Sequence, residues 1–359
     1  MTERDKLIVY LSRLEISNKK IEKVLENCGS MQGSMQLDDV LKSDFLLNIL
    51  STEEYHKALQ YDKIEFEGSL ANMKDQNIRI LTIFDEDYPQ SLVDLPDRPL
   101  VLFAKGDLSL LDRKCVAIVG TRMPSNYGKI VTDKFAGELA KSGLVIVSGL
   151  CYGVDEIAHR KTLDVGGKTI AVVGSGFNNI YPAKNTSLAR EIAEKGLLLS
   201  EYTPSFTPKR YTFPQRNRIV AGISNGVLIT EAGLKSGTLH TKEFALEYGK
   251  DIFVVPGNIN SEKSQLPNEL IKSGQAECVT SPDDIIEFYG MKKQAKENKM
   301  VQLSFDERKI LDLLSNGEKD IDYLAEKSGI PVNILNSCLT TLEIRGLIKR
   351  LPAKMFAAN

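Results

Sequence analysis

The sequence lacks the features of a membrane protein and those of a secreted, disulfide-bonded protein. No apolar run reaches the ~18 residues that suggest a membrane helix, and the charged start, Met1-Thr-Glu-Arg-Asp5, has no apolar stretch suited to a signal peptide. The five cysteines are far apart, and none sits in a C-x-x-C pair. Such a scattered set indicates free thiols in a reducing compartment. We therefore expect a cytoplasmic protein without membrane contact.

Histidine is also scarce, and neither sign of charge dominates. With three histidines in the chain, a metal site has few candidate ligands, and we expect neither a metal nor another cofactor. The net charge is only −2, and no long segment is strongly basic. Any nucleic-acid site must therefore be a local patch of cations.

Periodicity and composition divide the chain into four segments. At 359 residues, the chain is long enough for about two or three domains. Apolar residues recur at helical spacing near the start, no strand-like alternation appears before Arg79–Phe84, and a polar, lysine-rich stretch precedes the last segment. We predict a helical domain over residues 1–80, an α/β domain over 81–290, a linker over 291–303 and a further domain over 304–359.

The α/β prediction depends on short apolar runs that are unbroken rather than alternating, as strands buried on both faces require. Amphipathic helical stretches, such as Lys129–Lys141 and Glu156–Leu163, lie between them. This alternation predicts a parallel sheet, and ligands bind such sheets off the carboxyl ends of the strands. The runs are Cys115–Val119, Leu144–Val147, Thr169–Val173, Leu197–Leu199, Val227–Thr230 and Ile252–Val255.

The last segment has the pattern of a winged helix-turn-helix. Ser304 and Glu307 have capping-box spacing for the first of three helices. Pro331 follows a tight turn and is well placed to begin the third. Beyond that helix, Leu347–Leu351 and Met355–Phe356 are expected to pair as a small hairpin.

Small residues follow several of the apolar runs, at the edge where ligands are expected. A glycine at a strand end lets backbone amides approach an anion, and the start of the following helix favours negative charge. Arg122 adds a fixed cation suited to phosphate, although a plain turn with a surface arginine would look the same. The predicted phosphate-loop residues are Gly120, Thr121, Ser148, Gly149, Gly174, Gly176, Ser236, Gly237 and Thr238.

Two glycine-containing segments near the third apolar run imitate nucleotide-binding motifs without matching them. Gly174-Ser-Gly176 resembles the dinucleotide fingerprint, but Asn179 stands where the third glycine belongs. Gly166-Gly-Lys-Thr169 imitates a P-loop, but the required glycine at position 162 is a threonine, and the Lys-Thr pair enters a strand instead of a helix. ATP binding is therefore not predicted.

Asp155 and His159 stand four residues apart on a predicted helix. The pair could form a catalytic dyad or half of a metal site. Because no third ligand is nearby, we favour structural hydrogen bonds, since buried polar groups are normally paired.

The segment from Ser205 to Val220 mixes cations with aromatic rings and has no acidic residue. Cations that follow phosphates and rings that stack on bases are what sequence-tolerant binding of a single strand needs. The alternative is that the rings belong to the core and the arginines cap neighbouring helices. The candidate DNA-binding residues here are Lys209, Arg210, Phe213, Arg216 and Arg218, with Phe206 and Tyr211 interleaved.

Taken together, the motifs resemble the DprA/Smf family, the DNA-processing proteins of natural transformation. The match extends over about residues 80–290, and the helical start and winged-helix end are similar to the common family architecture. The matching text is Val116-Ala-Ile-Val-Gly-Thr-Arg122, Ser148-Gly-Leu-x-x-Gly-Val-Asp155-x-x-Ala-His159, Tyr181-Pro-x-x-Asn185, Phe213-Pro-x-Arg-Asn-Arg-Ile219, Glu231-Ala, Ser236-Gly-Thr-Leu239 and Val255-Pro-Gly257.

The resemblance implies an extended Rossmann-like domain between an N-terminal SAM-like helical domain and a C-terminal winged helix. It also implies a protein that binds and protects incoming single-stranded DNA, forms a homodimer through the Rossmann-like domain and loads the RecA recombinase. Carried over by residue, Arg122 is the first candidate for DNA contact, followed by Lys184, Arg216 and Arg218. Asn178, where the family usually has an aspartate, and Leu266-Pro267, where a glycine is expected before Asn268, depart from the pattern.

Two other functions compete with this reading. An enzyme similar to nucleoside-monophosphate phosphoribohydrolases would use Glu231, but the P-G-G-x-G-T pattern of those enzymes is absent, and we expect no catalytic activity. A transcription factor would use the winged helix, but its expected recognition helix, Pro331–Ile344, has no lysine or arginine with which to anchor phosphates. We favour a protein contact or weak DNA binding for that helix.

Overall fold

The computed structural model describes residues 1–29, 36–291, 303–315, 317–344, 347–351 and 355–358. It comprises two compact units, residues 1–293 and 294–359. The predicted linker, 291–303, lies outside the described residues except at its two ends. Within the described part of the chain, no helix has both the length and the apolar character needed to cross a membrane.

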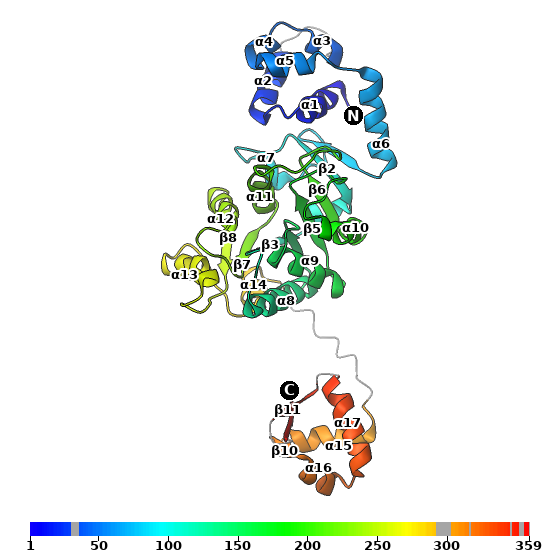
Figure 1. The fold of residues 1–359 in the computed structure, drawn as a ribbon, viewed down its shortest axis with the longest axis vertical. Helices are drawn as coiled ribbons and strands as arrows, with labels where there is room; N and C mark the ends of the chain where they lie inside the picture. The colour runs from blue at the N-terminus through cyan, green and yellow to red at the C-terminus, as the bar shows by residue number, and fades with distance from the viewer. Residues whose placement is uncertain (30–35, 292–302, 316, 345–346, 352–354, 359) are drawn as a thin grey trace. The chain divides into compact units, whose positions relative to one another are not determined.

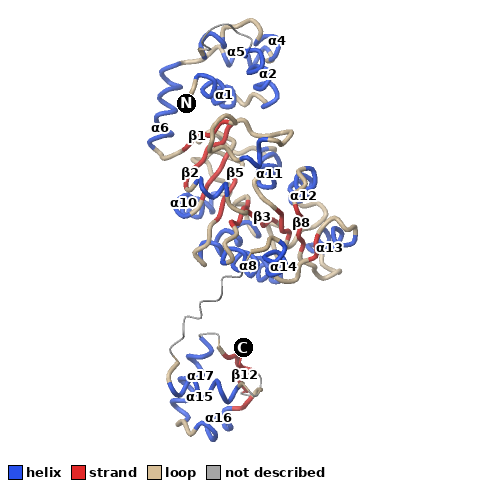
Figure 2. Tube along the Cα trace, turned by 180° about the vertical axis from the view of Figure 1, so that it is seen from behind, coloured by secondary structure: helices blue, strands red, loops and turns tan. Residues whose placement is uncertain are grey.

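A nine-stranded sheet runs through the first unit in the order β1-β2-β6-β5-β4-β3-β7-β8-β9 (Figures 1 and 2). From β6 to β8 in this order the strands pair in parallel, as the sequence pattern predicts, and β9, which was not predicted, pairs in parallel with β8. At the other edge, β2 pairs antiparallel with both β1 and β6, and it is not among the predicted strands. The strands are β1 (Arg79–Thr82), β2 (Val101–Gly106), β3 (Cys115–Val119), β4 (Val145–Ser148), β5 (Thr169–Val173), β6 (Leu197–Ser200), β7 (Gly226–Ile229), β8 (Asp251–Val254) and β9 (Glu277–Cys278).

Helices cover both faces of the parallel part of the sheet. In β3, Val116 and Ile118 pack in one layer with α8 and α9, whereas Ala117 and Val119 belong to the opposite layer with α11. Both faces of the strand are buried, which explains why its apolar run is unbroken. One layer holds α8 (Asn126–Lys141), α9 (Val154–Asp164), α10 (Thr186–Lys195) and α14 (Pro282–Phe288), and the other holds α7 (Gln90–Val93), α11 (Thr212–Gly222), α12 (Thr238–Glu247) and α13 (Gln265–Lys272).

The order of the strands reverses next to β3. After β3 the chain adds β4, β5 and β6 on one side, and it then crosses back to add β7, β8 and β9 on the other side. The loops that leave β3 and β7 therefore diverge from neighbouring carboxyl ends. Such a switch point leaves a crevice, which is where parallel α/β sheets bind ligands.

The N-terminal helices pack on the antiparallel edge of the sheet. Their apolar cluster includes Val101 and Phe103 of β2, and the buried Thr82 hydroxyl donates a 2.9 Å hydrogen bond to Asp5. The expected domain boundary after residue 80 falls inside β1. The helices are α1 (Glu3–Arg13), α2 (Asn18–Gly29), α3 (Leu37–Leu41), α4 (Leu46–Ile49), α5 (Thr52–Ala58) and α6 (Lys63–Asp75).

The second unit has the winged-helix architecture expected from its sequence. The capping box of Ser304 and Glu307 at the start of α15 is confirmed, and β11 and β12 form the predicted hairpin. A short strand that was not predicted, β10, pairs with β12. The elements are α15 (Phe305–Leu314), β10 (Lys319–Asp320), α16 (Ile321–Ser328), α17 (Val332–Ile344), β11 (Ile348–Leu351) and β12 (Met355–Ala358).

Candidate functional site

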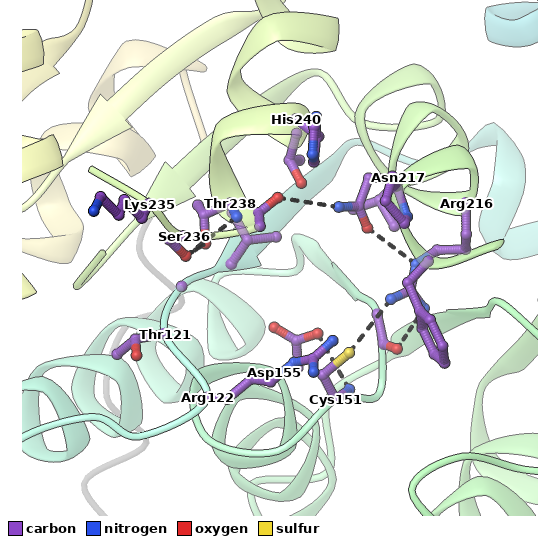
Figure 3. Close-up of a pocket in the computed structure, with 18 of the residues that line it drawn as sticks. Thr121, Arg122, Cys151, Asp155, Arg216, Asn217, Lys235, Ser236, Thr238 and His240 are labelled. Atoms are coloured by element: carbon purple, nitrogen blue, oxygen red, sulfur yellow. Dashed lines mark hydrogen bonds between the residues drawn. The ribbon is translucent and has the colours of Figure 1, made fainter. Parts of the chain in front are cut away.

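A pocket of about 850 Å³ lies at the switch point of the sheet (Figure 3). The loop after β3 contributes Gly120, Thr121 and Arg122, and the loop after β7 contributes Gly233 and residues 235–238. Figure 3 shows Arg122 and Asp155 on one side of the pocket and Ser236 and Thr238 on another. The pocket therefore occupies the position that the strand order predicts for a ligand.

The lining of this pocket is rich in cations. The acidic residues Asp155 and Glu262 also line it, together with the aromatic rings of Tyr181 and Phe213. This is the local cationic patch that a chain with a net charge of −2 needs for an anionic ligand. The lysines and arginines of the lining are Arg122, Lys209, Arg210, Arg216, Lys235 and Lys263.

The loop after β3 holds Arg122 at the mouth of the pocket. The Thr121 amide donates to the carbonyl of Glu231 at 2.7 Å, and a side chain at Gly120 would lie 2.7 Å from the same oxygen. The backbone is thus pinned to the end of β7 on one side. The Arg122 side chain is exposed, and its guanidinium carbon lies 5.9 Å from the centre of the Phe213 ring. A cation and a ring therefore face the same opening.

Glu231, the candidate for an enzymatic role, is buried and accepts hydrogen bonds from Ser125. Its side chain is 2% exposed and accepts hydrogen bonds from the Ser125 amide at 2.8 Å and the Ser125 hydroxyl at 2.5 Å. A side chain at Gly128 would collide with this carboxylate. Glu231 thus secures the start of α8, where a negative charge is also favoured by the helix dipole.

Ser236, Gly237 and Thr238 bring small residues to the start of α12. The Ser236 hydroxyl accepts from the Thr238 amide at 3.2 Å and donates to the Thr238 hydroxyl at 2.9 Å. Gly237 is exposed at the pocket. The start of a helix favours negative charge, so this loop, with the exposed Gly237 and the neighbouring Lys235, is suited to an anion.

Arg216 lies on α11 beneath the pocket and is only 3% exposed. Its guanidinium donates to the carbonyls of Gly149 and Val172, and to the Cys151 sulfur at 3.5 Å. These contacts tie α11 to the ends of β4 and β5. Arg216 therefore braces the floor of the pocket and adds positive charge to its lining.

Asp155 and His159 form separate structural contacts, as favoured from the sequence. Asp155 accepts a 3.2 Å hydrogen bond from the Cys151 amide, and burial raises the pKa of its carboxyl group. His159 bonds Thr169 at 2.7 Å through Nδ1. Burial, aided by the charge of Arg216, lowers the pKa of His159 to about 3. Within the described residues, no cluster of three or more potential metal ligands occurs.

Five predicted site residues lie outside the lining of the pocket. The Ser148 hydroxyl donates to the Ile118 carbonyl at 2.7 Å, Gly174 and Gly176 are buried, and Lys184 is exposed elsewhere on the same edge. Arg218 is 8% exposed. Ser148, Gly174, Gly176, Lys184 and Arg218 are therefore not brought together with the other predicted site residues in this pocket.

Arg218 lies between two acidic side chains. It pairs with Glu201, and its Nε lies 3.8 Å from Asp97. Two carboxylates thus neutralise it inside the fold. Arg216 and Arg218 are two residues apart in the sequence, so they lie on different faces of α11. Arg216 lines the pocket, whereas Arg218 packs against Glu201 and Asp97.

Several lining residues were not predicted from the sequence. Lys235 directly precedes the Ser-Gly-Thr loop, and this position in the sequence could have identified it as a site residue. Lys263, in the 3-10 turn Glu262–Ser264, and His240 of α12 carry no such signal. They reach the pocket only because the β8 loop and α12 fold beside the switch point.

The fold and its pocket define an extended Rossmann-like α/β protein with a cation-lined pocket at the switch point and a winged helix. The chain belongs to the DprA/Smf family of DNA-processing proteins. Residues 79–290 match the family model for DNA recombination-mediator protein A, and residues 294–354 match the DprA winged-helix domain.

Individual relatives agree with this assignment. The chain is 36% identical to Protein Smf of Escherichia coli K12 over 84% of this chain and 83% of that protein. The X-ray structure of DprA from Streptococcus pneumoniae matches with a TM-score of 0.71 at 35% identity, over 81% of this chain and 99% of that chain. A Helicobacter pylori DNA processing protein A, described for its single-stranded DNA binding mode, matches with a TM-score of 0.54 at 39% identity, over 59% of this chain and 95% of that chain.

Proposed function

We propose that this protein binds single-stranded DNA in the pocket at the switch point of its sheet. The observation that carries the proposal is the convergence of cations and aromatic rings from separate loops on one opening. A strand of DNA offers phosphates spaced along a flexible backbone and bases with exposed faces. A groove that combines both kinds of contact binds such strands with little sequence preference.

The pocket residues divide between these two tasks. Arg122, Arg210 and Lys235 are exposed and can each neutralise a phosphate. The ring of Phe213 lies 5.4 Å from that of Tyr181, at a tilt of 59°. Phe213 is half-buried, so part of its ring remains available to stack on a base. Duplex DNA, whose bases are already stacked, offers no base to this ring.

The family supports the finer steps of this proposal. The printed description of the Helicobacter pylori relative names single-stranded DNA binding. On family membership we also propose a cytoplasmic protein that protects incoming DNA, forms a homodimer through its Rossmann-like domain and loads RecA. Filament assembly by RecA on coated single-stranded DNA, with and without this protein, tests the last step. An unchanged rate would contradict it.

We further propose that the protein is not an enzyme. The competing phosphoribohydrolase activity needs a free glutamate, whereas both Glu231 oxygens accept hydrogen bonds from Ser125. Incubation with AMP or ATP is expected to give no turnover. Turnover that is lost in Glu231→Gln would overturn this part of the proposal.

The DNA-binding proposal is tested by comparing single-stranded and duplex DNA of equal length in a filter-binding assay with the full chain. We expect the single strand to bind more tightly, with an affinity that falls as salt rises. Lys235→Ala should weaken binding to every sequence. Equal affinity for the two forms of DNA, or binding that moves only when the winged helix is altered, would contradict the pocket.

A further inference from the structure

Beyond the pocket, Glu15 of the N-terminal helical domain contacts Lys209, one of the cations in the pocket lining. Both Glu15 oxygens accept hydrogen bonds from Lys209 Nζ, at 2.7 and 2.6 Å. The Tyr211 hydroxyl donates to Glu15 at 2.9 Å. The donor side chains belong to the basic and aromatic segment that leads into α11, so a distant part of the chain closes off one end of the predicted site.

The backbone of Glu15 suggests that its side chain is there for this contact. Glu15 follows the C-cap of α1, Leu14, with φ of 61°. A helix end in this left-handed conformation favours glycine or asparagine, because other side chains are strained there. A glutamate is a poor choice for the helix end alone. Its contacts with Lys209 and Tyr211 account for it.

The donors that Glu15 occupies are those that a phosphate would use. Lys209 Nζ lies 5.3 Å from the centre of the Phe206 ring, and Phe206 stacks on Tyr202 with centroids 4.4 Å apart. This shelf, Tyr202, Phe206 and Tyr211, continues the aromatic character of the pocket along the same segment. A strand that leaves the pocket over the shelf would place a phosphate at Lys209, where the carboxylate now lies.

The ion pair between Glu15 and Lys209 forms at neutral pH, but it contributes too little free energy to prevent a phosphate from replacing the carboxylate. Burial would raise the pKa of Glu15, but hydrogen bonds from Lys209 and Tyr211 outweigh that effect and keep the pKa below its usual value. Glu15 is therefore charged at neutral pH. The Lys209 and Glu15 side chains are each 44% exposed, and an ion pair this exposed contributes little to stability.

We propose that Glu15 is a built-in competitor for phosphate at Lys209 and Tyr211. The inference rests on the proposed function and adds an affinity-setting residue to it, contributed by the N-terminal domain. Short strands fill the pocket and leave Glu15 in place. Longer strands exchange the carboxylate for a phosphate, and each exchange returns a bare carboxylate to solvent, which lowers the net gain in affinity.

The test uses the full chain and a series of labelled oligothymidylates from about 4 to about 16 nucleotides. Glu15→Gln is expected to leave the affinity for the shortest strands unchanged and to raise it about two- to five-fold for the longest, the range of an exposed ion pair. The log–log salt dependence for long strands should steepen by up to about 0.7, one single-strand phosphate contact.

Two further variants separate this role from a structural one. Glu15→Gly suits the left-handed backbone, so it should fold at least as well as the parent protein and bind long strands more tightly. Glu26→Gln is the matched control, because Glu26 is an exposed residue of α2 with no ion pair given among the described residues. It makes the same change in net charge and should leave affinity unaltered.

The outcome is decided in the Lys209→Ala background. There, Glu15→Gln should raise the affinity for long strands much less than it does in the parent protein, since only the Tyr211 hydroxyl is left for Glu15 to occupy. Weaker binding by Glu15→Gln in the otherwise unaltered protein would show that Glu15 positions Lys209 for DNA, and it would overturn the inference, as would no change at any length. If the parent protein binds no oligothymidylate at all, the proposed function itself fails and the inference with it.

Discussion

Arg122 and Arg218 both stand at basic positions of family motifs, but the structure places them in opposite environments. Arg122 is exposed at the mouth of the pocket with no acidic partner given among the described residues. Arg218 is buried between Glu201 and Asp97. The comparison teaches that a cation serves a polyanion only where the fold leaves its charge unneutralised. Four predictions test this division between the rim and the interior.

The largest effect is expected for the interior arginine. Arg218→Ala leaves the half-buried Glu201 carboxylate without its main partner, and breaking a pair with a buried arginine in this way costs up to about 3–5 kcal/mol. Urea unfolding should show that loss, while the folded fraction keeps its affinity for single-stranded DNA. Arg210→Ala, an exposed arginine of the same segment, is the control and should unfold like the parent protein. Reduced affinity in folded Arg218→Ala would break the comparison.

A ring at the rim should affect binding and not stability. Phe213→Leu keeps an apolar side chain but removes the face on which a base can stack, so affinity should fall by about 1–3 kcal/mol with the salt dependence unchanged. Phe213→Tyr retains the face and should bind nearly as well. Equal loss in both variants, measured by fluorescence titration, would indicate that Phe213 acts by packing instead of stacking.

The interior should also respond to pH through His159. Its pKa is lowered to about 3 in the folded protein, so between the usual value near 6.5 and about 3 the unfolded chain binds a proton that the folded chain does not. Stability should therefore fall as the pH falls through this window, by up to about 1.4 kcal/mol per pH unit. His159→Asn, which can still bond Thr169, should flatten that slope in urea titrations at pH 7 and pH 5. An identical pH dependence in both proteins would be the contrary result.

The smallest effect is expected at Arg122, where the salt dependence of binding distinguishes a phosphate contact from a structural role. Arg122→Ala removes one phosphate contact, so affinity should drop for every sequence, and the log–log salt dependence should flatten by about 0.7. The melting temperature should stay unchanged, in contrast to Arg218→Ala. A lower melting temperature with an unaltered salt dependence would mean that Arg122 only braces its loop.

Much of the fold was predictable because it depends on local patterns. Unbroken apolar runs gave the parallel strands, and the Ser304–Glu307 capping box gave the start of α15. Strand β2 was not predicted, although Val101–Ala104 is an unbroken apolar run like that of β3. Leu102 and Ala104 face the main core, whereas Val101 and Phe103 face the N-terminal helices. Only the assembled unit shows both partners.

The candidate site was predictable in its loops and less so in its side chains. Gly120, Ser236 and Gly237 carry a signal that depends on backbone geometry, and all three line the pocket. Arg216 and Arg218 carry the same charge in the sequence as Arg122, but their exposure is set by packing. Lys263 has no local signal, because it enters the site through the turn after β8.

The sequence by itself determined the type of this protein: a parallel α/β core, a winged helix and small residues at the strand ends, because hydrophobic periodicity and glycine placement act within a few residues. Tertiary structure alone decided which cations remain free. Glu201 and Asp97 neutralise Arg218, Ser125 donates hydrogen bonds to Glu231, and Glu15 of the N-terminal helical region pairs with Lys209. Charge acts through space, and its partners are known only once the chain has folded.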